Sequence, residues 1–222
     1  MTFPEVALGL VYLGFQILLL PFLLEQGNLI LGNPFTITQL NFIFFCIDFI
    51  CVTIIFRKFL LTSIKKALNQ PFVCLRSAFL GLMLYWLISL LVNNFIIEVY
   101  PDFYNVNDAS ISGMTQENRT LMGIGTVLLV PVVEETLFRG VIFRSLYNRS
   151  PLLGFAVSVL SFGALHVLGY VGSYSPVHLL LCLLQYIPAG VCLGWAYVKA
   201  DSIWAPILIH MTINQIGILS MG

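Results

Sequence analysis

Long apolar runs separated by short polar breaks make up most of the chain. Because a helix needs about 20 apolar residues to cross a bilayer, the pattern predicts about seven transmembrane helices. No two-residue alternation and no long-range repeat is visible, so the pattern favours helices over strands. The predicted spans cover residues 4–24, 34–56, 77–97, 121–147, 151–170, 177–198 and 202–220. The sequence therefore predicts an all-α, polytopic membrane helix bundle.

The polar breaks between the predicted spans differ in charge. Half of the ten basic residues fall between positions 57 and 76, others follow the fourth and sixth spans, and segment 98–119 carries one. Because cytoplasmic loops of membrane proteins are enriched in Lys and Arg, we expect the basic segments and the N-terminus in the cytoplasm. Segment 98–119 is then expected outside. The first apolar run has no basic segment before it and no small-residue cleavage site, so we expect a retained span rather than a signal peptide.

Composition agrees with a membrane protein and excludes other classes. Of 222 residues, 59% are hydrophobic and 9% are charged, against about 25% charged in a typical soluble domain. The formal net charge is zero, so the chain offers no basic surface for nucleic acid. No polar segment is long enough for a second domain, so residues 1–222 are expected to form a single membrane domain. The five cysteines have no CxxC spacing and are interpreted as small buried side chains.

Three ionisable residues interrupt the fourth predicted span. Glu134, Glu135 and Arg139 lie within the apolar run 121–147, where a charge is costly and needs a partner or a function. Glu135 and Arg139 are four residues apart with the acid first, which favours an ion pair on one helix face. Glu134 lies about 100° around the helix from Glu135 and has no base at that spacing. The sequence predicts that the pair is structural and that Glu134 remains available for chemistry.

Other polar side chains fall at a similar depth in later spans. At about 1.5 Å per residue, Glu134 and His166 lie roughly 22 Å from the basic ends of their helices, and His210 and Asn214 roughly 13 and 20 Å. A single intramembrane His is more often a hydrogen-bonded helix contact than a functional group. His210 and Asn214, however, are four residues apart and share one helix face. Phe162 precedes His166 by four residues and is expected to pack under the imidazole. These spacings predict a shared polar layer.

Three further features are interpreted as structural. Asp48 is alone in the second span, and His178 lies at the start of the sixth without a polar companion. Both are expected to be hydrogen-bonded side chains facing the bundle. Gly190 and Gly194 have the spacing of small residues that lets two membrane helices approach closely.

The order of the polar motifs resembles a family of membrane proteases. Glu134-Glu-x-x-x-Arg139, Phe162-x-x-x-His166 and His210-x-x-x-Asn214 are similar to three ordered motifs of the CPBP family, the CAAX proteases and bacteriocin-processing proteins also called Abi. The type II CAAX prenyl endopeptidases belong to it. The resemblance covers residues 121–222, which would form the catalytic core. Residues 1–120 resemble the family only in being apolar and would supply additional transmembrane helices.

The resemblance implies an intramembrane endopeptidase with four site residues. Glu134 and His166 would activate water, because a carboxylate and an imidazole can share its proton. His210 and Asn214 would stabilise the tetrahedral oxyanion, for which a neutral amide is a suitable donor. The side chains that support them would be those of Glu135, Arg139 and Phe162.

The resemblance leaves the cofactor open. The family is often called metalloprotease, and Glu134, His166 and His210 would be a credible zinc set with an open fourth position. The acid and base suffice for a glutamate-dependent mechanism without metal, however, and the chain has no His-Glu-x-x-His motif. We favour the metal-free reading. Water must reach the polar layer in either case, and the basic loops suggest a cavity open to the cytoplasmic face.

Three function classes follow from these patterns. The first is an endopeptidase of a bacterial plasma membrane that cuts a membrane-associated or lipid-anchored peptide or protein. The second is a non-catalytic membrane protein of the same fold, acting in bacteriocin self-immunity or as a scaffold. The third is a proton-coupled transporter, which usually shows inverted repeats and interrupted helices that are not evident here. The motifs favour the first class.

Overall fold

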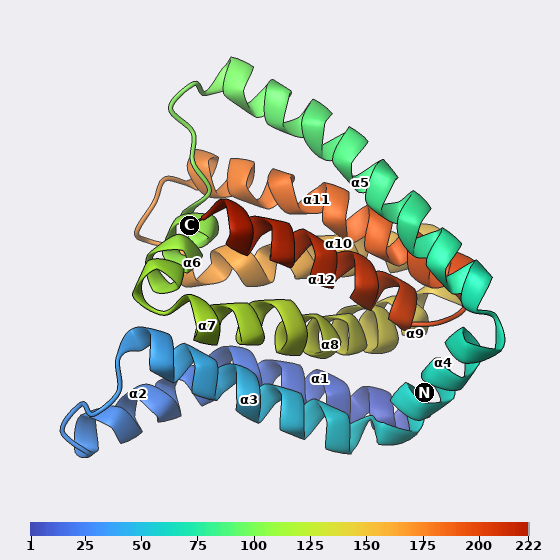
Figure 1. The fold of residues 1–222 in the computed structure, drawn as a ribbon, viewed down its shortest axis with the longest axis horizontal. Coiled ribbons are helices and arrows are strands. Elements are labelled where there is room, and N and C mark those ends of the chain that lie inside the picture. The colour runs from blue at the N-terminus through green and yellow to red at the C-terminus, as the bar shows by residue number, and fades with distance from the viewer. Residues whose placement is uncertain (222) are drawn as a thin grey trace.

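The computed structural model describes residues 1–221, and these residues form helices and no β-sheet (Figure 1). The first helices are α1 (Phe3–Leu18), α2 (Leu20–Ile30), α3 (Ile37–Ile55), α4 (Arg57–Asn69), α5 (Pro71–Val99) and α6 (Val106–Glu117). A continuous helical segment follows as α7 (Arg119–Met122), η1 (Gly123–Leu129), α8 (Val130–Glu134), η2 (Glu135–Phe143) and α9 (Arg144–Tyr147), with π-helical turns in η1 and η2. The remaining elements are α10 (Pro151–Val167), the short η3 (Leu168–Tyr170), α11 (Pro176–Ala200) and α12 (Trp204–Ser220).

The helices confirm an all-α membrane bundle, with five or six candidate spans where the sequence predicts about seven. Five helical segments are long and apolar enough to cross a membrane, and α1 with α2 would make a sixth despite a 42° bend between them. Pro21 explains the bend, because it lies in the first turn of α2 and its ring cannot continue the preceding helix. The predicted seventh span, α12, is 17 residues long. A helix that crosses a bilayer typically has about 20 residues.

Serine and threonine side chains define where several helices begin. Ser150 caps α10 and Ser175 caps α11, and in each case the hydroxyl accepts a backbone N–H three residues later while a proline follows directly. Thr36 caps α3 through a reciprocal contact with Gln39. These caps satisfy N–H groups that have no partner inside the helix, and proline is tolerated at the first helical position. The helix starts therefore follow from local sequence.

The segment from Arg119 to Tyr147 is the centre of the bundle. It contacts α1 and α3 on one side and α10 and α12 on the other, and α5 crosses α11 and α12 (Figure 1). In its most apolar stretch 61% of the residues are buried, against 11% for α5. The central helix therefore packs against protein over most of its surface, with Ile124 and Leu128 exposed, while α5 presents most of its surface to the surroundings.

Two polar segments that were expected to be loops are helical. Segment 57–76 forms α4 and the first turns of α5, so α5 begins at Pro71 rather than near residue 77. Phe59 and Leu60 of α4 are buried, while Lys58 and Lys65 are exposed, so α4 is amphipathic and lies along the end of the bundle. Segment 98–119 contains α6. These segments are polar on average, so their helices were not predicted. Each nevertheless has buried side chains on one face, such as Phe59 and Leu60 in α4.

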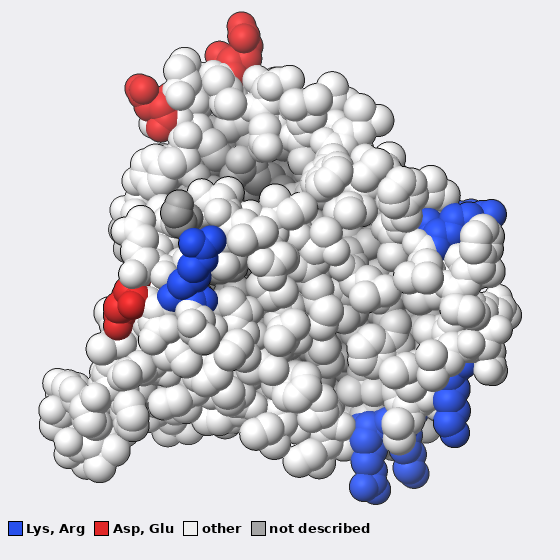
Figure 2. Space-filling view, viewed as in Figure 1, with Lys and Arg blue, Asp and Glu red and all other residues white. Residues whose placement is uncertain are grey.

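Most basic side chains gather at one end of the molecule, and one lies near the acidic side chains at the other end (Figure 2). In the view of Figure 2 basic side chains gather at the right and lower right, around α4, and acidic ones at the left and top. Lys66 pairs with Asp201 at the basic end, with 2.6 Å between Nζ and Oδ2. The basic end contains segment 57–76, which the sequence analysis identified as basic. Segment 98–119, which is polar but carries one basic residue, lies at the other end.

Close helix contact at Gly190 and Gly194 is confirmed. A Cβ added at Gly190 would lie 2.9 Å from a methyl group of Val159 and 3.2 Å from its Cα, and one at Gly194 would lie 2.9 Å from the Phe155 ring. Both contacts join α11 to α10. Glycine at these positions lets the two backbones approach more closely than any larger side chain would permit.

We expect Gly190→Ala to destabilise the protein by about 1–3 kcal/mol, because the added methyl group overpacks against the Val159 backbone. The measurement is the midpoint of thermal or denaturant unfolding in detergent. Gly14→Ala is the matched control, since nothing lies within 4 Å of its added Cβ and alanine is the better helix former. A Gly190→Ala midpoint equal to or above that of the control would contradict the close packing of α10 and α11.

Candidate active site

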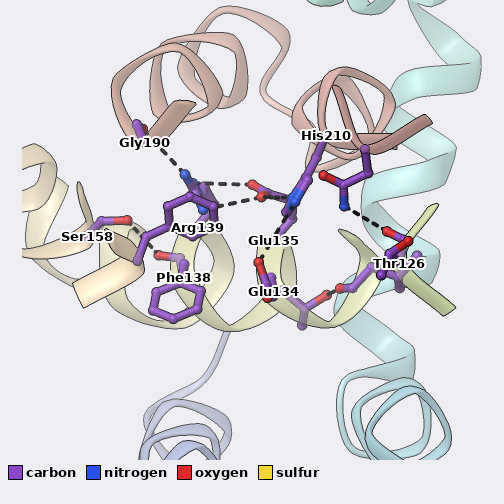
Figure 3. Close-up of polar contacts among 12 residues, drawn as sticks. Thr126, Glu134, Glu135, Phe138, Arg139, Ser158, Gly190 and His210 are labelled. Atoms are coloured by element: carbon purple, nitrogen blue, oxygen red, sulfur yellow. Dashed lines mark hydrogen bonds and ion pairs between the residues drawn. The ribbon is translucent and has the colours of Figure 1, made fainter. Parts of the chain in front are cut away.

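A buried ionic cluster links the central helix to α12 (Figure 3). The Arg139 Nε lies 3.2 Å from the Glu135 Oε2, and both side chains are fully buried, so the predicted pair is present. His210 Nδ1 donates to the Glu135 Oε1 at 2.8 Å, and Arg139 Nη1 donates to the same oxygen at 3.2 Å. The carboxylate of Glu135 therefore orients His210 as well as holding Arg139, a role that spacing along the sequence did not reveal.

The Arg139 guanidinium has contacts on its other sides. Its Nη2 donates to the Gly190 carbonyl at 3.4 Å, and its Cζ lies 4.4 Å above the centre of the Phe162 ring. A cation over an aromatic face is stabilised by the electron density of the ring, especially away from water. The arginine thus joins α11 and α10 to the central helix, and Phe162 packs against a charge as well as against imidazole rings.

Glu134 lies at the cavity side of this cluster, next to His210 (Figure 3). Its side chain is 12% exposed, and its Oε2 lies 3.9 Å from His210 Nε2. That distance is too long for a direct hydrogen bond but fits one bridged by a water molecule. Within residues 1–221 the Glu134 Oε2 has no hydrogen-bond partner although it is buried. Glu134 is the carboxylate that remains after the ionic cluster is satisfied, as the sequence predicts.

His166 is held by its own helix and by an aromatic ring. Its Nδ1 lies 2.9 Å from the Phe162 carbonyl, and because a carbonyl only accepts, Nδ1 must carry the proton. Nε2 therefore keeps its lone pair. The imidazole stacks on Tyr186 with 4.2 Å between ring centres, and Phe162 lies 4.9 Å from it and 5.9 Å from His210. The expected packing of Phe162 beside His166 is confirmed.

Asn214 donates to a backbone oxygen that the central helix leaves free. Its Nδ2 lies 2.7 Å from the Thr126 carbonyl (Figure 3). In the π-helical register of η1 the Val130 N–H bonds to the Gly125 carbonyl, so the Thr126 carbonyl would need the N–H of Pro131, which proline lacks. The proline in the fourth predicted span is the sequence signal that could have identified this contact. One amide proton of Asn214 remains for another acceptor.

A cavity of about 980 Å³ connects the four predicted site residues, which come from three helices: Glu134, His166, His210 and Asn214 all line it. Glu135 and Arg139 do not line it and lie behind the wall. The remaining wall comes from α1, α3, α5, α6, η3 and α11, and none comes from the basic α4. The wall therefore gives no support to the expectation of a cavity open toward the basic loops.

A polar network beside α6 was missed in the sequence. Asn105 Nδ2 donates to Gln185 Oε1 at 2.8 Å, and Gln185 Nε2 donates to Asn93 Oδ1 at 3.0 Å. The Tyr186 hydroxyl donates to Asn105 Oδ1 at 3.3 Å and lies 3.5 Å from Asp108 Oδ1. All of these residues line the cavity. They come from α5, α11 and the start of α6, so no single stretch of sequence contains them.

The three suggested zinc ligands do not converge. In residues 1–221 no three His, Cys, Asp or Glu side chains are grouped closely enough to hold a metal ion. Glu134 Oε2 and His210 Nε2 lie 3.9 Å apart, whereas the His166 ring stacks on Tyr186 of α11. This side-chain arrangement does not fit a three-ligand zinc site.

The features interpreted as structural have hydrogen-bond partners. Asp48 accepts from the Tyr12 hydroxyl at 2.6 Å and also borders the cavity. His178 is buried, its Nε2 donates to the Tyr104 carbonyl at 2.9 Å, and its ring stacks on Tyr174. The five cysteines are free thiols.

Comparisons with known proteins match the part of the chain that contains this site. The family model described as "Type II CAAX prenyl endopeptidase Rce1-like" matches residues 116–216, which include all four site residues. A Bacillus subtilis (strain 168) protein named "Putative membrane peptidase YdiL" is 31% identical over 101 residues, covering 45% of this chain and 36% of that protein. An Escherichia coli "Uncharacterized 24.3 kDa protein" is 33% identical over 95 residues, covering 41% of this chain and 40% of that protein.

These similarities have a defined extent. The matched region spans about two fifths of the length of the curated relatives, and no solved structure matches the chain. Residues 116–216 resemble the type II CAAX prenyl endopeptidases, as the motifs predict, and the matches support an intramembrane protease at the level of the family.

We expect Arg139→Met to destabilise the protein by about 3–5 kcal/mol, because it leaves the Glu135 carboxylate buried without its cation. The double variant Glu135→Leu/Arg139→Met should lose less than the sum of the single losses, since both charges are removed together. Unfolding in detergent measures the three variants as a double-mutant cycle. Strictly additive losses would show that the two side chains are not coupled.

Proposed function

We propose that this protein is an intramembrane endopeptidase that hydrolyses a peptide bond of a membrane-associated peptide or protein. The observation that carries the proposal is the single cavity lined by Glu134, His166, His210 and Asn214. Peptide hydrolysis needs a base for water and donors for the oxyanion. The four side chains supply both within one enclosed space. The bacterial relatives support a bacterial plasma membrane as its location.

Glu134 acts as the general base in this proposal, and His166 lines the same cavity. The Glu134 Oε2 is buried and has no hydrogen-bond partner within residues 1–221, so it can accept a proton from a water molecule. His166 keeps its Nε2 lone pair because Nδ1 donates to the Phe162 carbonyl. That lone pair can accept the second hydrogen of the same water. Water held between two acceptors has its oxygen directed at the peptide carbonyl.

His210 and Asn214 act as the oxyanion donors. Nδ1 of His210 already donates to Glu135, so Nε2 can donate as well when the imidazole is protonated. The imidazolium has two nearby carboxylates, at 2.8 Å and 3.9 Å. With His210 protonated, the charges of Glu134, Glu135, Arg139 and His210 sum to zero, which lowers the cost of burying them. Asn214 contributes its remaining amide proton.

The proposed reaction conserves atoms and charge. Water gives one proton to Glu134 as its oxygen forms a bond to the carbonyl carbon, and the carbonyl oxygen becomes the oxyanion held by His210 and Asn214. When the C–N bond breaks, the departing nitrogen takes the proton from Glu134. The products are a carboxylic acid and an amine. The negative charge moves from Glu134 to the oxyanion and back, past the fixed Glu135–Arg139 pair.

We expect Glu134→Gln to lower the cleavage rate by about 10²–10⁴-fold, the usual contribution of a general base. The assay uses purified protein in detergent with two quenched peptides, one with a prenylated tetrapeptide tail and one resembling a leader peptide. Glu25→Gln is the matched control, because Glu25 is exposed on α2 and does not line the cavity. Full activity of a folded Glu134→Gln protein would favour a non-catalytic role in immunity or as a scaffold.

We expect cleavage to continue in the presence of chelators, with less than one metal ion bound per protein. The reason is that Glu134, His166 and His210 do not converge as a ligand set, while zinc needs at least three protein ligands at a catalytic site. Elemental analysis of the purified protein gives the metal content. Loss of activity on chelation and its recovery with zinc alone would instead identify a metallopeptidase.

A further inference from the structure

The two ends of the bundle differ in charge more strongly than the loops alone indicate (Figure 2). Eight of the ten basic residues lie at the end formed by α4 and the adjoining helix termini, Arg139 is buried at the centre, and Arg119 lies at the other end. The eight are Arg57, Lys58, Lys65, Lys66, Arg76, Arg144, Arg149 and Lys199. Because a bias of Lys and Arg toward one side sets the orientation of membrane proteins, the basic end is the cytoplasmic end.

The cavity lies in the other half of the molecule. On α5, which begins at the basic end with Pro71, the lining residues fall between positions 85 and 93. On α12, which begins beside Asp201, they fall between positions 210 and 221. Asn105, Asp108 and Ser110 from the α6 region complete the wall. The space-filling view shows a hollow between the upper part of α5 and the end of α12, away from the basic side chains at the right and lower right and with one basic side chain nearby at the left (Figure 2).

We propose that the cavity opens on the side of the membrane away from the cytoplasm, so that the substrate is a peptide segment at the outer face of the bilayer. The direction of opening rests on the cavity and the charge distribution alone. The identification of a peptide as the occupant rests on the proposed function. A tail on the cytoplasmic side would meet α4 and the basic helix ends, which contribute no residue to the wall.

The cavity wall matches such a segment chemically. Asn93, Gln185 and Asn105 form a row of side-chain amides, and each amide carries both a donor and an acceptor, as does a peptide backbone. Trp86 and Leu90 of α5 also line the cavity and are 46% and 58% exposed. The row of amides can hydrogen-bond to the backbone of an extended peptide. The exposed apolar side chains of Trp86 and Leu90 can contact the part of the same peptide that lies in the membrane. Asp108 in the wall disfavours acidic side chains there.

Labelling of lysines tests the direction of opening on the unmodified protein. All four lysines, Lys58, Lys65, Lys66 and Lys199, lie at the basic end. In intact spheroplasts a membrane-impermeant amine reagent should leave them unlabelled, and after lysis it should label the exposed Lys58, Lys65 and Lys199. Peptide mass spectrometry measures both. Labelling of these lysines in intact spheroplasts would overturn the proposal.

Gln116→Lys provides the matched positive control. Gln116 is exposed on α6 and does not line the cavity, so a lysine there should be labelled in intact spheroplasts. If this variant does not accumulate, the wild-type protein still decides the orientation of the basic end. Its lysines should be labelled after lysis and not in intact spheroplasts. Labelling of the introduced lysine only after lysis would place α6 in the cytoplasm and overturn the proposal.

Sealed vesicles test the substrate separately. A quenched peptide with an apolar half and an uncharged polar half is added outside right-side-out and inside-out vesicles that contain equal amounts of protein. Cleavage should be fast in the right-side-out vesicles and recover in the inside-out ones after detergent. Cleavage confined to sealed inside-out vesicles, or equal in both, would overturn access from the outer face. No cleavage in any preparation, with the expected lysine labelling, would reject the endopeptidase and leave the direction of opening intact.

Discussion

The need to neutralise charge inside an apolar bundle determines most of this structure. Arg139 and Glu135 are fully buried, and neither could stay ionised there without the other. The cluster takes in His210 from α12, the Gly190 carbonyl from α11 and the Phe162 ring from α10. Three helices therefore dock on the central helix through one set of charges. Their mutual orientation, and with it the cavity, depends on these contacts.

The same constraint separates two neighbouring carboxylates into different roles. Glu135 accepts hydrogen bonds from Arg139 and His210 and does not line the cavity, whereas Glu134 lines the cavity and accepts no hydrogen bond at its buried Oε2. The π-helical turn before α8, together with Pro131, leaves the Thr126 carbonyl free to hold Asn214. Such turns are uncommon and recur at functional sites. Local backbone irregularity and buried charge thus act together on one site.

The bundle also divides its polar groups between two ends. Lysines and arginines surround α4, while neutral amides and Asp108 surround the cavity near α6. A basic end suits contact with anionic lipid headgroups on one face of the membrane. The amide-lined end can bind a peptide without a strong charge of its own. Orientation in the membrane and recognition of substrate are thereby assigned to separate parts of the chain.

The sequence by itself determined the helical class, the Glu135–Arg139 pair and the polar layer of Glu134, His166, His210 and Asn214, because these depend on apolar length and spacing along one helix. It predicts about seven spans where five or six helical segments are long and apolar enough, since α12 is 17 residues long and α1 and α2 are separated by a bend at Pro21. The bond from His210 to Glu135 and the amide row of Asn93, Gln185 and Asn105 were decided by tertiary structure alone. Each joins residues distant in sequence, and only the packing of helices brings such groups within hydrogen-bonding distance.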